Sequence, residues 1–173
     1  MRKLGIVLAS MLLALAFASF HTLRAQTETF TDANVDYTLE LPSPTWRLSE
    51  RPDAEHSLAG FVYGDRMDGY LQIRKEVVDA GVTPDNLSQR ESEQKLRFLP
   101  GFVEGKGEKF AGRLGGYAFN YEYTSAGKPM AGRIYYLQAD NRTIYVLRFT
   151  AQRDRLGRMR NQTDVIARSF RLK

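Results

Sequence analysis

The sequence has no cysteine in 173 residues and only two histidines. The absence of thiols excludes disulfide bonds, thiolate metal sites, cysteine nucleophiles and a lipid-modified cysteine. His21 lies in the apolar amino-terminal segment, which leaves His56 for the rest of the chain. A zinc site takes three or four His, Cys or carboxylate ligands, and a serine triad pairs its histidine with a nucleophile motif that is missing here. We therefore expect no catalytic residues, no cofactor and no metal site.

The first 25 residues are typical of a secretory signal peptide. Arg2 and Lys3 form a positive start, residues 4–20 are mostly apolar, and Ala25 is the small residue that precedes a cleavage site. We expect cleavage between Ala25 and Gln26, export to the periplasm or the medium, and no membrane span afterwards. An uncleaved amino-terminal membrane anchor is the alternative, since about 17 apolar residues is the lower limit for crossing a bilayer.

Cleavage changes both the size and the charge of the protein. Arg2, Lys3 and Arg24 would leave without any acid, so the formal charge of +5 would fall to +2. The remaining 148 residues suit one domain with its own core. We expect a short polar leader at 26–29 and a single domain at 30–173.

Positive charge is concentrated towards the carboxyl end. Residues 142–173 contain nine Lys or Arg against two acids, whereas residues 26–141 contain eighteen acids and thirteen bases. Such an end can attract phosphates, anionic lipids or acidic polymers, and it is equally compatible with a solvated helix surface. No specific nucleic-acid contact is expected. The candidate anion-contact surface, whose binding should fade with salt, consists of Arg153, Arg158, Arg160 and Arg168.

Alternating apolar residues predict strands along most of the chain. Tyr37, Leu39 and Leu41 share one face of a strand at 35–41, Pro42 ends it, and Trp46 follows as a core residue. A hairpin loop rich in turn-forming residues is expected at 64–69. The other predicted strands are 58–63, 70–78, 102–110, 117–124, 134–139 and 143–151.

Two helices are predicted. Thr83 as N-cap and Pro84 at the first helical position begin the first helix, which should end near Leu99. The second helix spans about 154–168. Without a βαβ rhythm, the pattern predicts an α+β fold with a mainly antiparallel sheet of about six to seven strands flanked by two helices. The apolar stripe of the second helix is formed by Leu156, Met159, Thr163, Ile166 and Phe170.

Aromatic residues alternate along two predicted strands. The strand at 117–124 has four of one parity, from Tyr117 to Tyr123, and the strand at 143–151 repeats the pattern. Such ladders usually pack beneath helices, although a stacking platform for sugars or bases has the same pattern. The residues expected to be mostly buried are Trp46, Tyr37, Phe119, Tyr121, Phe149, Ile166 and Phe170.

Four motifs suggest a family. They are Tyr37–Pro42 followed by Trp46, then residues 114–121, the pair 135–136 with 144–151, and residues 166–171. Together they resemble the PsbP-like proteins, part of the superfamily shared with the Mog-type Ran-release factor, over about residues 30–173. The resemblance implies an α/β/α sandwich and a non-enzymatic accessory or binding role. It assigns no functional residue to this chain.

The sequence therefore favours an exported accessory protein that docks to a protein or envelope partner without catalysis. One alternative is a carboxylate-dependent hydrolase, for which Asp65, Asp68 and Glu122 are the candidate residues. Another is a carrier of a small apolar ligand, which needs an apolar cavity between sheet and helix.

Overall fold

The structure is a computed structural model that describes residues 27–53 and 58–173. The predicted signal peptide with its cleavage site at Ala25 and Gln26 lies outside the described residues, as does His56. No helix within the described ranges is long and apolar enough to cross a membrane.

Seven strands form one antiparallel sheet, whose spatial order is β3-β4-β5-β9-β8-β7-β6. Consecutive strands are mostly neighbours, so the sheet is a meander interrupted once, where β9 inserts beside β5. The strands are β3 (Trp46–Glu50), β4 (Ala59–Tyr63), β5 (Asp65–Val77), β6 (Val103–Phe110), β7 (Gly116–Ser125), β8 (Lys128–Gln138) and β9 (Thr143–Gln152).

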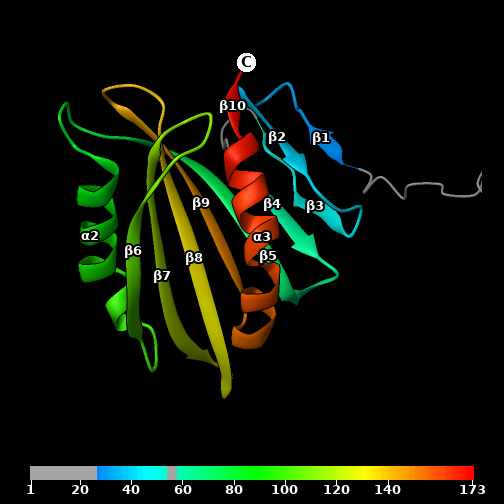
Figure 1. Ribbon diagram of the computed structural model, residues 1–173, viewed down its shortest axis with the longest axis vertical. Coiled ribbons are helices and arrows are strands. Elements are labelled where there is room, and N and C mark those ends of the chain that lie inside the picture. Colours follow the sequence, from blue (N-terminus) through cyan, green and yellow to red (C-terminus); the bar gives the residue numbers. More distant parts are fainter. Residues whose placement is uncertain (1–26, 54–57) are drawn as a thin grey trace, which may run out of the picture.

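A small second sheet lies beside the large one. It has three antiparallel strands in the order β1-β2-β10: β1 (Glu28–Phe30), β2 (Tyr37–Leu41) and β10 (Arg171–Leu172). Thus Glu28 and Thr29, predicted as part of a polar leader, pair with β2. Figure 1 shows β1, β2 and β10 on the right, next to the carboxyl end of α3 (Arg153–Ser169).

The two helices cover opposite faces of the large sheet. α3 packs against β8, β9, β5 and β2, whereas α2 (Pro84–Gln94) packs against β7 and β8. In Figure 1, α3 crosses the sheet and α2 stands beyond β6. The predicted α+β class, with seven strands and two flanking helices, is confirmed; the second sheet was not predicted.

The prediction of a hairpin loop at residues 64–69 is wrong. β5 begins at Asp65, so Gly64 alone separates it from β4, and the positive φ of 66° at Gly64 suits a glycine. The pairing jumps from Val62 opposite Tyr70 to Tyr63 opposite Asp65, which makes this stretch a bulged part of the sheet. The turn-forming residues at 64–69 therefore form a bulged part of the sheet and not a loop.

Other boundaries also differ from the sequence pattern. β3 was not predicted, because this edge strand has only two apolar residues at alternate positions, Trp46 and Leu48, which is too short a pattern. β8 begins six residues earlier than expected, at Lys128, opposite Ser125 of β7. α2 ends at Gln94 and is followed by a 3-10 turn, η2 (Leu96–Phe98), in place of one helix to Leu99.

The core predictions are confirmed. All seven residues expected to be buried are at most 5% exposed, and the α3 stripe from Leu156 to Phe170 faces the sheet. Phe170 is fully enclosed, with its ring 4.8 Å from Tyr37 and 5.0 Å from Tyr145. This aromatic group joins the small sheet to the large one.

We expect Phe170→Ala to lower the free energy of unfolding by about 3–5 kcal/mol, because it removes a buried ring and leaves a cavity. Chemical denaturation monitored by circular dichroism measures the change. Leu172→Ala is the matched control, because Leu172 is 42% exposed. A Phe170→Ala protein as stable as the control would show that this aromatic group does not hold the two sheets together.

Candidate functional site

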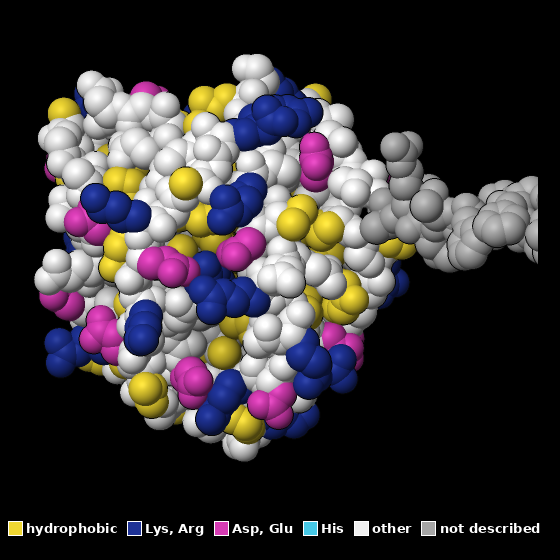
Figure 2. Space-filling model, in the orientation of Figure 1, with side chains coloured by type: hydrophobic (Ala, Val, Ile, Leu, Met, Phe, Trp, Pro, Cys, Tyr) yellow, Lys and Arg dark blue, Asp and Glu magenta, His cyan; other side chains and the backbone are white. Residues whose placement is uncertain are grey.

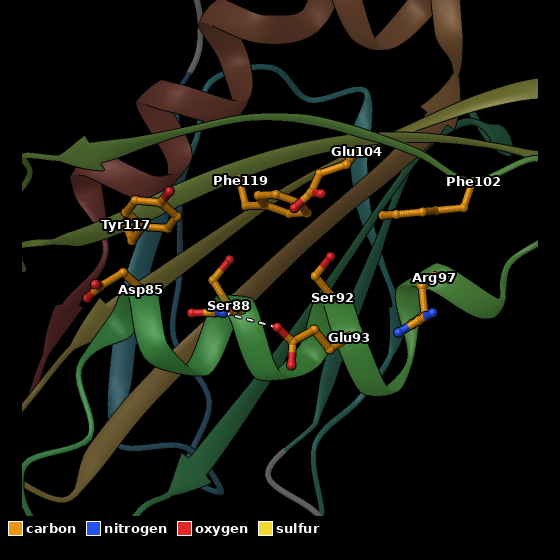
Figure 3. Close-up of a pocket in the computed structure, with 10 residues that line it drawn as sticks. Asp85, Ser88, Ser92, Glu93, Arg97, Phe102, Glu104, Tyr117 and Phe119 are labelled. Atoms are coloured by element: carbon orange, nitrogen blue, oxygen red, sulfur yellow. Dashed lines mark hydrogen bonds between the residues drawn. The ribbon is translucent and has the colours of Figure 1, made fainter.

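A cleft of about 540 Å³ lies between α2 and the strands β6 and β7. We call it the α2–β6 cleft. Ser88 and Ser92 of α2 point across it towards Phe119 of β7, while Glu104 of β6 reaches in from the opposite wall (Figure 3). The full lining is Asp85, Ser88, Gln89, Ser92, Glu93, Arg97, Phe102, Glu104, Tyr117 and Phe119.

α2 is positioned by a buried carboxylate more than by apolar packing. Glu91 is 7% exposed and accepts hydrogen bonds from Tyr136 Oη at 2.9 Å and Lys95 Nζ at 3.2 Å, and it is ion-paired with Arg74 of β5. Only Leu87 adds a buried apolar side chain within α2 itself. Burying a charged group costs free energy unless it is paired. The contacts of Glu91 therefore fix the position of α2 along its axis and its rotation about that axis.

The same contacts determine how Glu91 titrates. Burial by itself raises the pKa of Glu91, but Arg74 and the hydrogen bonds from Tyr136 and Lys95 outweigh it, so the pKa lies below its ordinary value of 4.5. A carboxylate whose folded pKa is lowered stabilises the fold above its unfolded pKa. That stabilisation is lost as the pH falls through the folded pKa.

Sequence reasoning missed Glu91. One signal was present: Glu91 follows Leu87 by four residues, so the two lie on the same face of the helix. A charged residue in the middle of a thin apolar stripe indicates a buried ion pair. Its partners Arg74 and Tyr136 come from two different strands, and no local pattern connects them to α2.

One wall of the cleft is the aromatic ladder of β7. Phe119 and Tyr121 are buried and stacked, with ring centroids 6.4 Å apart, whereas Tyr117 and Tyr123 are only half-buried. A Cβ at Gly107 of β6 would lie 1.8 Å from the Tyr117 hydroxyl, so the glycine allows that ring to lie across β6. The middle of the ladder is core, as predicted, and Tyr117 at its end faces the cleft.

The cleft is negatively charged. Its lining contains three carboxylates, those of Asp85, Glu93 and Glu104, and one guanidinium, that of Arg97. The pKa of Asp85 is lowered, chiefly by a hydrogen bond with the Thr83 side chain, so this carboxylate is ionised at neutral pH. An aromatic wall beside carboxylates suits a cationic group, which interacts favourably with both.

A second groove, of about 460 Å³, lies on the other face between α3 and β6–β8. Its lining includes the apolar residues Val103, Ala131 and Leu156 together with Arg133. The Arg133 side chain is 4% exposed and donates to Tyr135, Asn120, Glu108 and Asp164. Because those acceptors already engage its guanidinium, Arg133 is a structural link between the sheet and α3.

The four predicted anion-contact residues lie along α3, and three of them have separate partners in the structure. Arg153 pairs with Glu122 at 3.2 Å, and Arg160 pairs with Glu108 at 3.2 Å. Arg168 donates to the Ala111 carbonyl oxygen at 2.8 Å. Figure 2 shows basic and acidic side chains interleaved over this face. The surface that includes Arg158 is therefore not uniformly positive, and the contact with anions stays a prediction.

The structure does not bring the candidate carboxylates of a hydrolase into one cleft. The backbone N–H of Asp68 donates to Asp65 at the start of β5, and Asp68 pairs with Arg155 at 2.8 Å. Glu122 lies on β7, paired with Arg153. Within the described ranges, no group of three or more His, Cys, Asp or Glu is placed to hold a metal ion.

No family model and no curated protein matches the sequence, but solved structures match the fold. LpqN of Mycobacterium tuberculosis is 18% identical, with a TM-score of 0.55 over 86% of this chain and 91% of LpqN. The cyanobacterial PsbP of Synechocystis sp. PCC 6803 is 12% identical, with a TM-score of 0.59 over 88% and 96% of the two chains. The Saccharomyces cerevisiae Ran-binding protein Mog1p is 10% identical, with a TM-score of 0.61 over 86% and 96%.

These likenesses define the class of structure. The chain has the fold shared by PsbP and Mog1, as the four sequence motifs indicated. At such low identity the match establishes the fold alone, and functions on one fold differ with the residues of the site. The function therefore has to be argued from the cleft.

We expect Glu91→Gln to lower the free energy of unfolding at pH 7 by about 1.5–3 kcal/mol, because it removes a charged partner from Arg74. The difference from the unmodified protein should shrink as the pH falls from 4.5, the ordinary pKa, through the lower folded pKa of Glu91, because the carboxylate then becomes protonated in the folded protein as well. Urea denaturation between pH 3 and pH 7 measures both effects. The control is Glu93→Gln, an exposed position on the same helix. Parallel pH profiles for the Glu91→Gln and unmodified proteins would contradict the assignment.

Proposed function

We propose that this chain is an exported, non-catalytic binding protein, and that the α2–β6 cleft receives a basic segment of a protein partner. The observation that carries the proposal is the lining of the cleft: three carboxylates and three aromatic rings against one guanidinium. Lysine and arginine side chains combine a positive charge with an apolar stem, so they complement both kinds of surface.

The partner should bind through its side chains and not as an added strand. β6 is the edge strand of the sheet and is exposed over most of its length, which ordinarily invites strand pairing. Four charged residues and a register shift between Glu104 and Gly107 oppose such pairing. Asn120 also donates to the Lys106 carbonyl oxygen within this bulge, at 2.8 Å.

The neighbours in fold are compatible with a binding role. LpqN is described as involved in cell envelope biogenesis, and Mog1p as a Ran-binding protein. An envelope role for this chain agrees with the signal peptide expected at residues 1–25. The partner we infer is a protein of the compartment to which the chain is exported.

Photo-crosslinking in the producing cells tests the position of the interface. A crosslinking residue in place of Gln89 or Glu93, on the α2 side of the cleft, should give a discrete adduct with one protein. The same residue in place of Val77, which is 73% exposed on β5, should not. Adding Glu93→Lys and Glu104→Lys together should reduce the adduct formed at Gln89 by about tenfold, because like charges repel.

A charge-matched control keeps this experiment specific. Glu28→Lys combined with Glu40→Lys changes the net charge equally at β1 and β2, far along the chain from the cleft, and should leave the Gln89 adduct unchanged. Adducts that form equally well at Val77, or that survive the charge reversal in the cleft, would overturn the proposed binding site.

Export is tested separately. The protein recovered from the periplasm or the medium should have a mass that corresponds to a chain beginning at Gln26. Replacing Ala25 with Arg should block cleavage, because the peptidase needs a small residue there. A full-length protein retained in the membrane fraction of unmodified cells would support the anchor alternative instead.

A further inference from the structure

The sheet face beneath α2 is covered along only part of its length. Leu87 and Leu96 of α2 and η2 pack over β7 and β8. The start of β5 and the end of β9 carry polar side chains on the same face, where Tyr70 pairs with Thr150 and Gln72 with Arg148. A cleft of about 280 Å³ opens there; it is lined by Arg66, Tyr70, Gln72, Tyr123, Arg148 and Thr150.

Both guanidinium groups of this cleft are oriented by tyrosines. Arg148 donates from Nε to the Tyr121 hydroxyl at 2.8 Å and lies 5.5 Å from the centre of that ring. Arg66 lies 4.4 Å above the centre of the Tyr70 ring. An aromatic support holds an arginine in place without neutralising its charge, so two positive groups face the same small volume.

Every side chain that lines the cleft can donate a hydrogen bond, and none of the six is a carboxylate. The Tyr70 hydroxyl is buried, and within the described part of the chain it lies close to the carboxylate of Glu50 and the guanidinium of Arg66. Burial raises the pKa of Tyr70, with a smaller contribution from Glu50, and it also raises that of Tyr123. These hydroxyls are therefore neutral donors at neutral pH.

The charge of the cleft is only weakly compensated from outside. Glu50 lies 3.7 Å from Arg66, but the two side chains are 40% and 68% exposed, so the pair is loose and screened by solvent. Arg153 and Arg160 of α3 are paired with carboxylates at a shorter distance, 3.2 Å in each case. The face beneath α2 thus presents the less neutralised pair of arginines.

We propose that the Arg66–Arg148 cleft binds a phosphate-type oxyanion, either free phosphate or the phosphate of a lipid headgroup. Guanidinium groups donate two parallel hydrogen bonds to such an anion, and the hydroxyls of Tyr70 and Thr150 supply further donors. This site is independent of the α2–β6 cleft and of the partner proposed for it.

Titration with inorganic phosphate, followed by amide NMR shifts of the protein without its signal peptide, tests the site. Saturable shifts should appear on β5 and β9 around Arg66 and Arg148. We expect Arg66→Gln and Arg148→Lys each to weaken binding by about tenfold, since lysine keeps the charge of Arg148 but loses its planar fork. Arg158→Gln on α3 is the charge-matched control and should change the affinity by less than about twofold.

Vesicles distinguish the two sources of phosphate. Sedimentation with phosphatidylglycerol vesicles, compared with phosphatidylcholine vesicles, shows whether a headgroup is bound. Binding that is lost in Arg66→Gln and Arg148→Lys supports a lipid phosphate, and phosphate shifts without vesicle binding support the free anion. The proposal is overturned if neither probe binds, or if Arg158→Gln weakens binding as much as Arg66→Gln does. Unchanged spectra of the free variants confirm that each one folds.

Discussion

The large sheet has two faces, and in the part of the chain that the structure describes one α-helix packs on each of them. α3 does so through a continuous apolar stripe that ends at Phe170, against Tyr37 and Tyr145. α2 has no comparable stripe; within it only Leu87 is a buried apolar residue, and Glu91 is buried beside it. The pairing of Glu91 with Arg74, Tyr136 and Lys95 therefore fixes the position of a helix that hydrophobic packing alone would hold only weakly.

This unequal covering explains where the clefts lie. A helix seated by polar contacts leaves space on either side, and the α2–β6 cleft opens where serines face the aromatic ladder. Past η2 the same face is open, and there Arg148 lies against Tyr121. α3 seals most of its own face, and the groove beside it is bounded by Arg133, whose bonds to Glu108 and Asp164 are structural. The positions of the candidate clefts therefore follow from the contacts that hold each helix on the sheet.

Electrostatic complementarity within the fold also limits what the arginines of α3 can do. Acids from β6 and β7 compensate the bases of the carboxyl-terminal helix, as in the pairs Arg153–Glu122 and Arg160–Glu108. Along the sequence, the acidic residues are concentrated before residue 142 and the basic residues after it. Folding brings the two segments together, so that their charges compensate each other. The charged side chains that line the two candidate clefts differ in sign, acidic in the α2–β6 cleft and basic in the Arg66–Arg148 cleft.

The sequence by itself determined the α+β class, most of the strands, both helices and the buried residues, because these follow from local periodicity and capping. It could not determine β3, the bulge after Gly64 or the small sheet, since their pairings join segments that carry little local signal. Neither cleft was predictable either. Glu91 is 17 residues from Arg74 and 45 residues from Tyr136 along the sequence, and it contacts both. Arg148 contacts Tyr121, from which it is separated by 27 residues. Only the tertiary structure decides such contacts, because strand order and helix placement determine which distant side chains share one buried volume.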